Sequence, residues 1–210
     1  MRGFMGARRL LNVRPHMHVI RFAAFLFAAL ASVLPGNAAA PAQDIPKATW
    51  EPIYFRSINK LSGMVGWRPL RNLALQSDSF EVRIWIGFGI GPLEVLSIQR
   101  EGSAWRGRYA IHRMWLAGPV AVQSVVPKSG WAQHWVRLVR LGLLTLPDSS
   151  TLPRSESMVA DGVSYVVEIN KDGRYRTYMY GNPKHEKWPE AKRMIEIVEA
   201  LRDEILPELK

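Results

Sequence analysis

Cysteine is absent from this sequence of 210 residues. Disulfide bonds, thiolate nucleophiles, cysteine-ligated metals and a lipid-modified cysteine are therefore excluded. The motifs G-x-S-x-G and H-E-x-x-H are also missing, and we assign no S-x-x-K motif to residues 41–210, which would remove three common signatures of serine and metal hydrolases. We expect a fold that is held together by packing alone, without a cofactor or a metal.

Acidic residues are absent from residues 1–40, which carry five arginines. An apolar stretch of 13 residues, 22–34, follows these arginines and precedes the small-residue run that ends at Ala40. Charged, apolar and small-residue regions in this order are typical of a cleavable secretory signal peptide, with cleavage near Ala40, after either Ala40 or Ala42. The apolar stretch is shorter than the roughly 20 residues that span a bilayer as a helix, so we expect no permanent membrane span. The sequence thus predicts a periplasmic or secreted protein.

The leader also changes the charge balance. Without residues 1–40 the chain carries 23 basic and 18 acidic residues, so its formal net charge falls from +10 to +5. A mildly basic exported domain suits an anionic envelope polymer, lipid headgroups or an envelope protein as partner, and nucleic acid is not expected. The alternative is that the basic residues only form a solvated surface. The start of translation stays open between Met1 and Met17, because a chain from Met17 keeps all three regions of the leader.

Hydrophobic spacing divides the rest of the chain into two parts. Residues 41–75 show no clear period, which predicts an irregular N-terminal arm that packs against a single α+β domain over residues 76–210. Alternating apolar residues predict an antiparallel meander over 80–86, 94–100, 105–114 and 120–126, and a C-terminal hairpin over 163–169 and 174–180. Helical spacing predicts helices over 129–141 and from Pro189 onward. The expected fold is an antiparallel sheet of about six strands packed by two helices.

The two predicted helices carry distinct patterns. In the first, His134 is expected in the polar part and Gly142 is expected to end the helix. The apolar face of this helix is predicted to hold Trp131, Trp135, Leu138 and Val139. The stripe that should bury the last helix consists of Ala191, Met194, Val198, Leu201 and Ile205.

The hairpin turn Asn170-Lys171-Asp172-Gly173 suggests a type I turn with a glycine bulge. That register would set Glu168 opposite Arg176 and turn Tyr175 toward the core. The residues expected to face outward on this strand are Arg174, Arg176, Tyr178 and Tyr180.

This outward row suggests a ligand-binding surface, which Arg83 and Trp85 of the first predicted strand would extend. Arginines and exposed aromatic rings suit an anionic or carbohydrate ligand. The alternative is that cross-strand pairs of this kind only stabilise the sheet. If helices cover both faces of the sheet, the surface does not exist.

Three further features of the sequence are weaker indications of function. Glu168, Asn170 and Asp172 are spaced like the start of a calcium loop, but Met179 stands where a bidentate glutamate is needed, so no metal site is predicted. The glycine-rich stretch 87–92 follows a strand without the spacing of a dinucleotide loop, and we interpret it as a wide turn. His185 is expected in a loop before the last helix.

The leading interpretation is an exported, small, non-catalytic binding or interaction module. One alternative is a small envelope hydrolase that uses the glycine-rich stretch 87–92 and His112. The other is a structural accessory domain of a larger complex.

Overall fold

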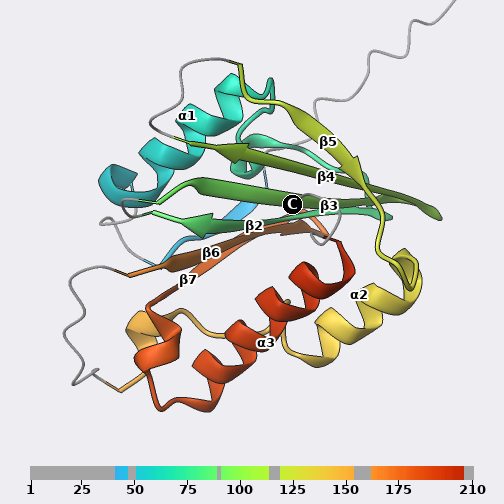
Figure 1. Ribbon diagram of the computed structural model, residues 1–210. Coiled ribbons are helices and arrows are strands. Elements are labelled where there is room, and N and C mark those ends of the chain that lie inside the picture. Colours follow the sequence, from blue (N-terminus) through green and yellow to red (C-terminus); the bar gives the residue numbers. More distant parts are fainter. Residues whose placement is uncertain (1–40, 47–50, 89–90, 114–118, 154–161, 206–210) are drawn as a thin grey trace, which may run out of the picture. The chain divides into compact units, whose positions relative to one another are not determined.

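A mixed seven-stranded sheet between helices forms the described part of the chain (Figure 1). The computed structural model describes residues 41–46, 51–88, 91–113, 119–153 and 162–205, so the predicted leader 1–40 lies outside the described residues. The strand order is β1-β7-β6-β2-β3-β4-β5. The α+β class is confirmed. In the described residues, none of the helices is long and apolar enough to cross a membrane.

The antiparallel part of the sheet follows the predicted meander and hairpin. Strands β2, β3, β4 and β5 pair in succession, and the hairpin β6–β7 joins the sheet through antiparallel pairing of β6 with β2. The bounds are Ser79–Gly87 for β2, Leu93–Glu101 for β3, Ala104–His112 for β4, Val122–Val125 for β5, Ser164–Lys171 for β6 and Arg174–Gly181 for β7.

The N-terminal arm was predicted to be irregular, but in the structure it supplies a seventh strand and a third helix. Strand β1, Ala42–Asp44, pairs in parallel with the start of β7, so the sheet is mixed rather than antiparallel. Helix α1, Arg56–Met64, follows a five-residue π-helical turn at Glu51–Phe55. This helix is short and contains many polar residues, so its apolar residues gave no clear helical spacing in the sequence.

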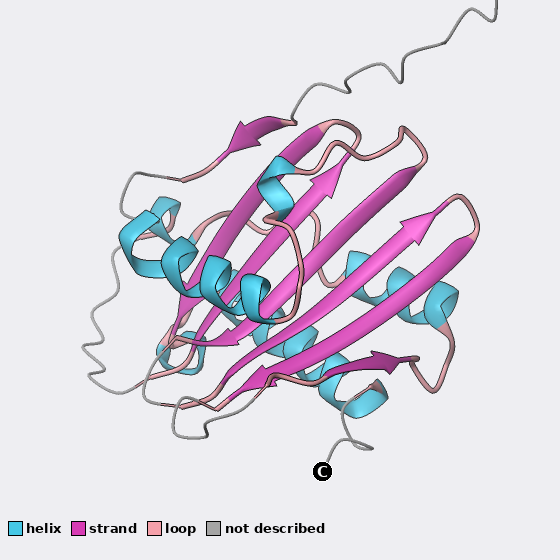
Figure 2. Ribbon diagram, turned by 90° about the horizontal axis from the view of Figure 1, so that it is seen from above, coloured by secondary structure: helices cyan, strands magenta, loops and turns pink. Residues whose placement is uncertain are grey.

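Helices cover both faces of the sheet. Helix α1 packs on one face, and α2, Trp131–Arg140, and α3, Pro189–Glu204, pack on the other (Figures 1 and 2). Short 3₁₀ turns complete the described helical elements at Leu70–Asn72, Ser149–Thr151 and Pro183–His185.

Each face of the sheet has its own apolar core. The larger core joins one side of the strands to α2 and α3, and the smaller core joins the other side to the arm through residues such as Phe55, Ile58 and Trp67. A fully buried side chain of this size stabilises the folded state by about 1.5–3 kcal/mol. Strand β2 therefore has no exposed face, although it alternates between apolar and polar residues.

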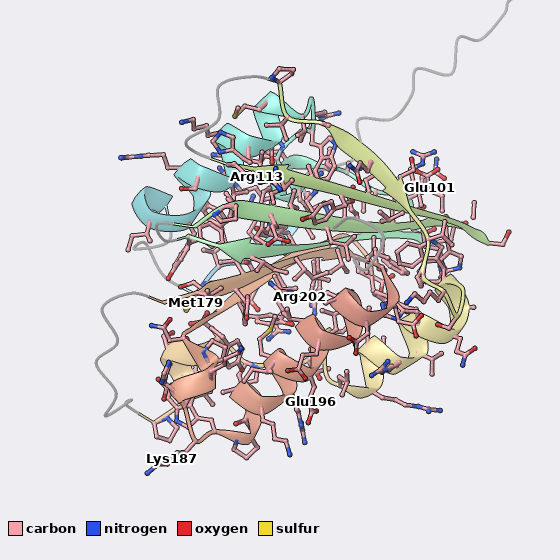
Figure 3. The ribbon with its side chains drawn as sticks, in the orientation of Figure 1. Glu101, Arg113, Met179, Lys187, Glu196 and Arg202 are labelled. Atoms are coloured by element: carbon pink, nitrogen blue, oxygen red, sulfur yellow. The ribbon has the colours of Figure 1, made fainter. Side chains whose placement is uncertain are left out.

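Helix α3 shows the predicted pattern. All five residues of its expected apolar stripe are buried. On its outer side Lys192 Nζ lies 3.9 Å from Glu196 Oε1, and Glu196 is on the side of the helix away from the sheet (Figure 3). Pro189 begins the helix, where its missing N–H costs no hydrogen bond.

The hairpin turn differs from its prediction by one residue of register. Asp172 and Gly173 have φ angles of 53° and 69°, as a two-residue type I′ turn requires. Lys171 therefore pairs with Arg174, and Glu168 faces Thr177 instead of Arg176. Because side chains alternate, this shift by one residue moves every side chain of β7 to the face opposite the predicted one.

Candidate functional site

The structure does not bring the six predicted site residues together on one surface. Arg83 and Trp85 are buried on the face of the sheet that α1 covers. Tyr178 and Tyr180 belong to the core under α2 and α3, on the opposite face. Arg174, at the start of β7, is exposed. The predicted outward row is therefore wrong, because its register was shifted and because helices cover both faces.

The two tyrosines anchor the loop that follows α2. Both are fully buried, with the Tyr178 hydroxyl donating to the Leu143 carbonyl at 2.8 Å and the Tyr180 hydroxyl donating to the Pro147 carbonyl at 2.9 Å. Burial raises the pKa of both hydroxyls above the usual value for tyrosine, so they stay protonated as donors. Their contacts tie the loop to the sheet.

Arg176 and Arg174 do meet in a cleft at the end of the sheet. The cleft has a volume of about 400 Å³ and lies where β1 joins the hairpin. We call it the sheet-end cleft; it is lined by Ala42, Gln43, Asp44, Leu144, Ile169, Lys171, Asp172, Arg174, Tyr175 and Arg176. Among the six predicted site residues, Arg174 and Arg176 line this cleft.

The charges of the sheet-end cleft are largely engaged. Arg176 donates to the carbonyl oxygens of Leu144, at 2.8 Å, and Leu146, and its Nε lies 3.8 Å from Asp44 Oδ2. Lys171 forms an ion pair with Asp172. Arg174 makes no ion pair with any residue that the structure describes, so its guanidinium is available to a ligand.

Arg83 belongs instead to a buried polar cluster under the arm. Its Nε donates to Glu81 Oε1 at 2.8 Å, and its Nη1 donates to the Arg68 carbonyl at 2.9 Å. Ser97 Oγ donates to the same Glu81 oxygen at 2.9 Å. The guanidinium lies 5.2 Å from the centre of the Trp67 ring. Because buried charges need partners, this cluster fixes the arm on the sheet.

Trp85 holds a second buried carboxylate. Its Nε1–H donates to Glu168 Oε2 at 2.7 Å, and the Tyr175 hydroxyl donates to Glu168 Oε1 at 2.7 Å. Full burial raises the pKa of Glu168, an effect that the charge of Arg83 and these hydrogen bonds oppose. The carboxylate points toward the arm and makes no pair with Arg176.

The residues of the calcium-like sequence are also engaged elsewhere. The Asn170 amide donates to the carbonyl oxygens of Leu70 and Leu73, at 3.0 and 2.7 Å. Glu168 is held by Trp85 and Tyr175, while Asp172 pairs with Lys171. These three side chains therefore do not converge on one point. Among the described residues no group of three or more His, Asp and Glu side chains is placed to hold a metal ion.

The glycine-rich stretch does lie beside His112. Both line a cleft of about 240 Å³, together with Ser57 and Lys60 of α1. We call it the glycine-lip cleft; its described lining is Ile53, Ser57, Lys60, Leu61, Phe88, Gly91, Leu93 and His112. Phe88 has a left-handed φ of 69°, so the chain bends sharply at its rim.

The sequence analysis assigned no S-x-x-K motif to residues 41–210, and this was wrong, because Ser57 and Lys60 have that spacing. They form an S-x-x-K pattern, in which a serine nucleophile and a lysine lie on one face of a helix. Ser57 is half-buried and Lys60 is exposed. The pattern lay inside the segment predicted to be irregular, where helical spacing was not considered.

Comparisons with models of protein families, with curated proteins and with solved structures found no match.

Proposed function

We propose that this protein is an exported, non-catalytic binding module that holds an anionic envelope polymer at the sheet-end cleft. The observation that carries the proposal is the position of Arg174, an exposed cation without an ion pair among the described residues, beside the apolar wall of a 400 Å³ cleft. Export is supported by the three-part leader of residues 1–40.

The weakness of one surface charge argues for a polymer rather than a small anion. An exposed ion pair contributes only about 0.2–1 kcal/mol, which alone gives no useful affinity. A polymer with repeated anionic groups can contact Arg174 together with other exposed basic residues of the chain, whose formal net charge without residues 1–40 is +5, so that several weak contacts combine. The apolar wall, which includes Leu144 and Ile169, adds contact area for the backbone of such a polymer.

The first test is co-sedimentation of the purified protein with isolated cell-envelope fragments. We expect retention at low salt and release at high salt, because salt screens contacts between exposed charges. Arg174→Glu should clearly weaken retention, whereas Arg193→Glu, the same change at an exposed position of α3, should leave it nearly intact. Both variants should keep the wild-type melting temperature.

Three outcomes contradict the proposal. Absence of retention at either salt concentration removes polymer binding. Equal loss in both variants shows an effect of net charge rather than of the cleft. Retention that resists high salt points to an apolar or protein contact. Arg176→Glu is unsuitable here, since Arg176 holds two backbone carbonyls and its loss would unfold the local structure.

Export has a separate test. Cleavage near Ala40 leaves β1, which begins at Ala42, whole in the mature chain. Mass spectrometry of the protein from the periplasmic fraction should therefore find a chain that begins at Pro41. A protein that stays in the cytoplasm with residues 1–40 attached would contradict the proposal.

A second candidate, a small envelope hydrolase, is favoured by the glycine-lip cleft. It brings His112 and Gly91 beside Ser57 and Lys60, a set that could supply a nucleophile and a base. A fluorophosphonate probe should then label Ser57 covalently, and Ser57→Ala should abolish labelling while the protein stays folded. His112→Ala should slow ester hydrolysis. Absence of labelling and of ester hydrolysis would remove this candidate.

A further inference from the structure

His134 of α2 occupies a position that sequence reasoning placed on the polar side of the helix. The structure turns it inward, between Trp131 and Leu138 on the buried side. Only 1% of its surface is exposed. Within the part of the chain that the structure describes, neither Nδ1 nor Nε2 has a hydrogen-bond partner.

This arrangement calls for an explanation, because native proteins leave few buried polar groups unpaired. Burial lowers the pKa of His134, with Glu204 opposing and Arg137 adding to that shift, so the imidazole is neutral. A neutral imidazole has one N–H donor and one nitrogen acceptor. A leucine would fill a core position without leaving either group unpaired. The unpaired nitrogens therefore indicate a hydrogen-bond partner from outside the chain.

A cleft lies directly at this histidine. Its volume is about 560 Å³, within the range of small-molecule sites. We call it the α2 cleft; it is lined by Ser129, Gln133, His134, Val136, Arg137, Arg140, Leu141 and Glu204. It shares no lining residue with the sheet-end cleft or the glycine-lip cleft.

The charges of the α2 cleft favour an anion. Arg137 and Arg140 are three residues apart on an α-helix, so they project from the same side of it and can contact one multi-oxygen group. Neither forms an ion pair within the described residues. The one acidic residue of the lining, Glu204, is engaged: its Oε2 accepts from the Ser129 N–H at 2.9 Å. This hydrogen bond also lowers the pKa of Glu204.

We infer that the α2 cleft binds the phosphoryl group of a small phosphorylated molecule. Arg137 and Arg140 pair with its oxygens, and the His134 N–H donates to the oxygen that reaches the floor of the cleft. Val136 and Leu141 contact the apolar part of the molecule. The three terminal oxygens of a phosphoryl group can satisfy two guanidinium groups and an imidazole together, which the two oxygens of a carboxylate cannot do equally well.

This site is independent of the proposed function, since it uses a different cleft and different arginines. Arg174→Glu should leave it unchanged. Loss of polymer binding would accordingly say nothing against it.

Titration of the purified protein with inorganic phosphate tests the inference, with heat measured by calorimetry and the ring nitrogens of His134 followed by NMR. Saturable binding should shift the His134 resonances. The double variant Arg137→Gln with Arg140→Gln should bind phosphate at least about tenfold more weakly. Lys192→Gln with Arg193→Gln, an equal change of charge on the outer side of α3, should bind within about twofold of wild type.

His134→Leu separates a ligand contact from a structural role. It should raise the melting temperature, because two unpaired nitrogens leave the interior, and it should weaken phosphate binding. If His134→Leu does not fold, the comparison of the two double variants still tests whether the α2 cleft binds phosphate. Absence of saturable binding, equal weakening in both double variants, or acetate binding as tightly as phosphate would each overturn the inference.

Discussion

Gly107, in the middle of β4, allows α2 to approach the sheet closely. A Cβ atom at this position would lie 2.1 Å from Cζ2 and 2.7 Å from Cη2 of Trp131, and 2.6 Å from the Val125 carbonyl oxygen. Ordinary contact between carbon atoms requires about 3.5–4.0 Å. In Gly107→Ala the Trp131 ring must therefore move by about 1.5 Å, which disturbs its stacking on Trp105, at a centroid distance of 6.1 Å.

The expected cost follows from these contacts. Overpacking of a core typically costs about 1–3 kcal/mol, and the upper end applies because a backbone carbonyl cannot turn away. Replacing glycine by alanine returns about 0.4–1 kcal/mol through the unfolded chain. We expect a net loss of about 2 kcal/mol in the free energy of unfolding. For a domain of this size, the melting temperature should fall by about 4–8 °C.

Gly63→Ala is the matched control. Gly63 lies in the last turn of α1, and a Cβ there would meet nothing within 4 Å. Its replacement should stabilise the protein by about 0.5–1 kcal/mol through helix propensity. Both variants are compared with wild type by calorimetry and by urea unfolding. A Gly107→Ala protein as stable as wild type would refute the close packing of Trp131 on β4.

Three further predictions concern buried polar groups. Burial raises the pKa of Glu168, so the stability that this residue contributes is complete below about pH 4.5 and is lost as pH rises through the folded-state pKa. In thermal melts from pH 4 to 8, the melting temperature of Glu168→Gln should therefore rise relative to that of wild type as pH rises. A difference in melting temperature that stays constant with pH would contradict this. Tyr178→Phe leaves the Leu143 carbonyl unpaired and should lower the free energy of unfolding in urea by about 1–2 kcal/mol. An unchanged urea midpoint would contradict this prediction. Asp148→Ala should cost about 2 kcal/mol in the free energy of unfolding, because its Oδ2 accepts from the Met179 N–H, beyond the part of β7 that pairs with β1. Hydrogen exchange at the Met179 amide should rise, and unaltered protection there would count against this role.

The hairpin shows where local pattern is insufficient. Both a bulged type I turn and a type I′ turn suit Asn-Lys-Asp-Gly, and they differ by one residue of register. Alternation would settle the choice only if one face were polar. On β7 both faces carry tyrosines, and Tyr175, Tyr178 and Tyr180 are all buried, so alternation gives no preference for one register. The predicted binding row failed for this reason and because helices cover both faces of the sheet.

The candidate sites were predictable to different degrees. Arg174 was identified from the sequence and is exposed at a cleft, and His112 does lie beside the glycine-rich stretch. Ser57 and Lys60 were overlooked because their helix was not expected. His134 was assigned to the wrong side of α2, since a histidine among tryptophans gives no local sign that it faces the core.

The sequence by itself determined the α+β class, the positions of four meander strands and a hairpin, and the course of α3, because these depend on the spacing of apolar residues along one segment. Only the tertiary structure decided that β1 pairs in parallel with β7, that α1 covers the second face, and that Arg83, Trp85 and Glu168 are buried. Each of these depends on which distant segment covers a given face. A polar residue on a strand has the same local pattern whether water or a helix lies above it.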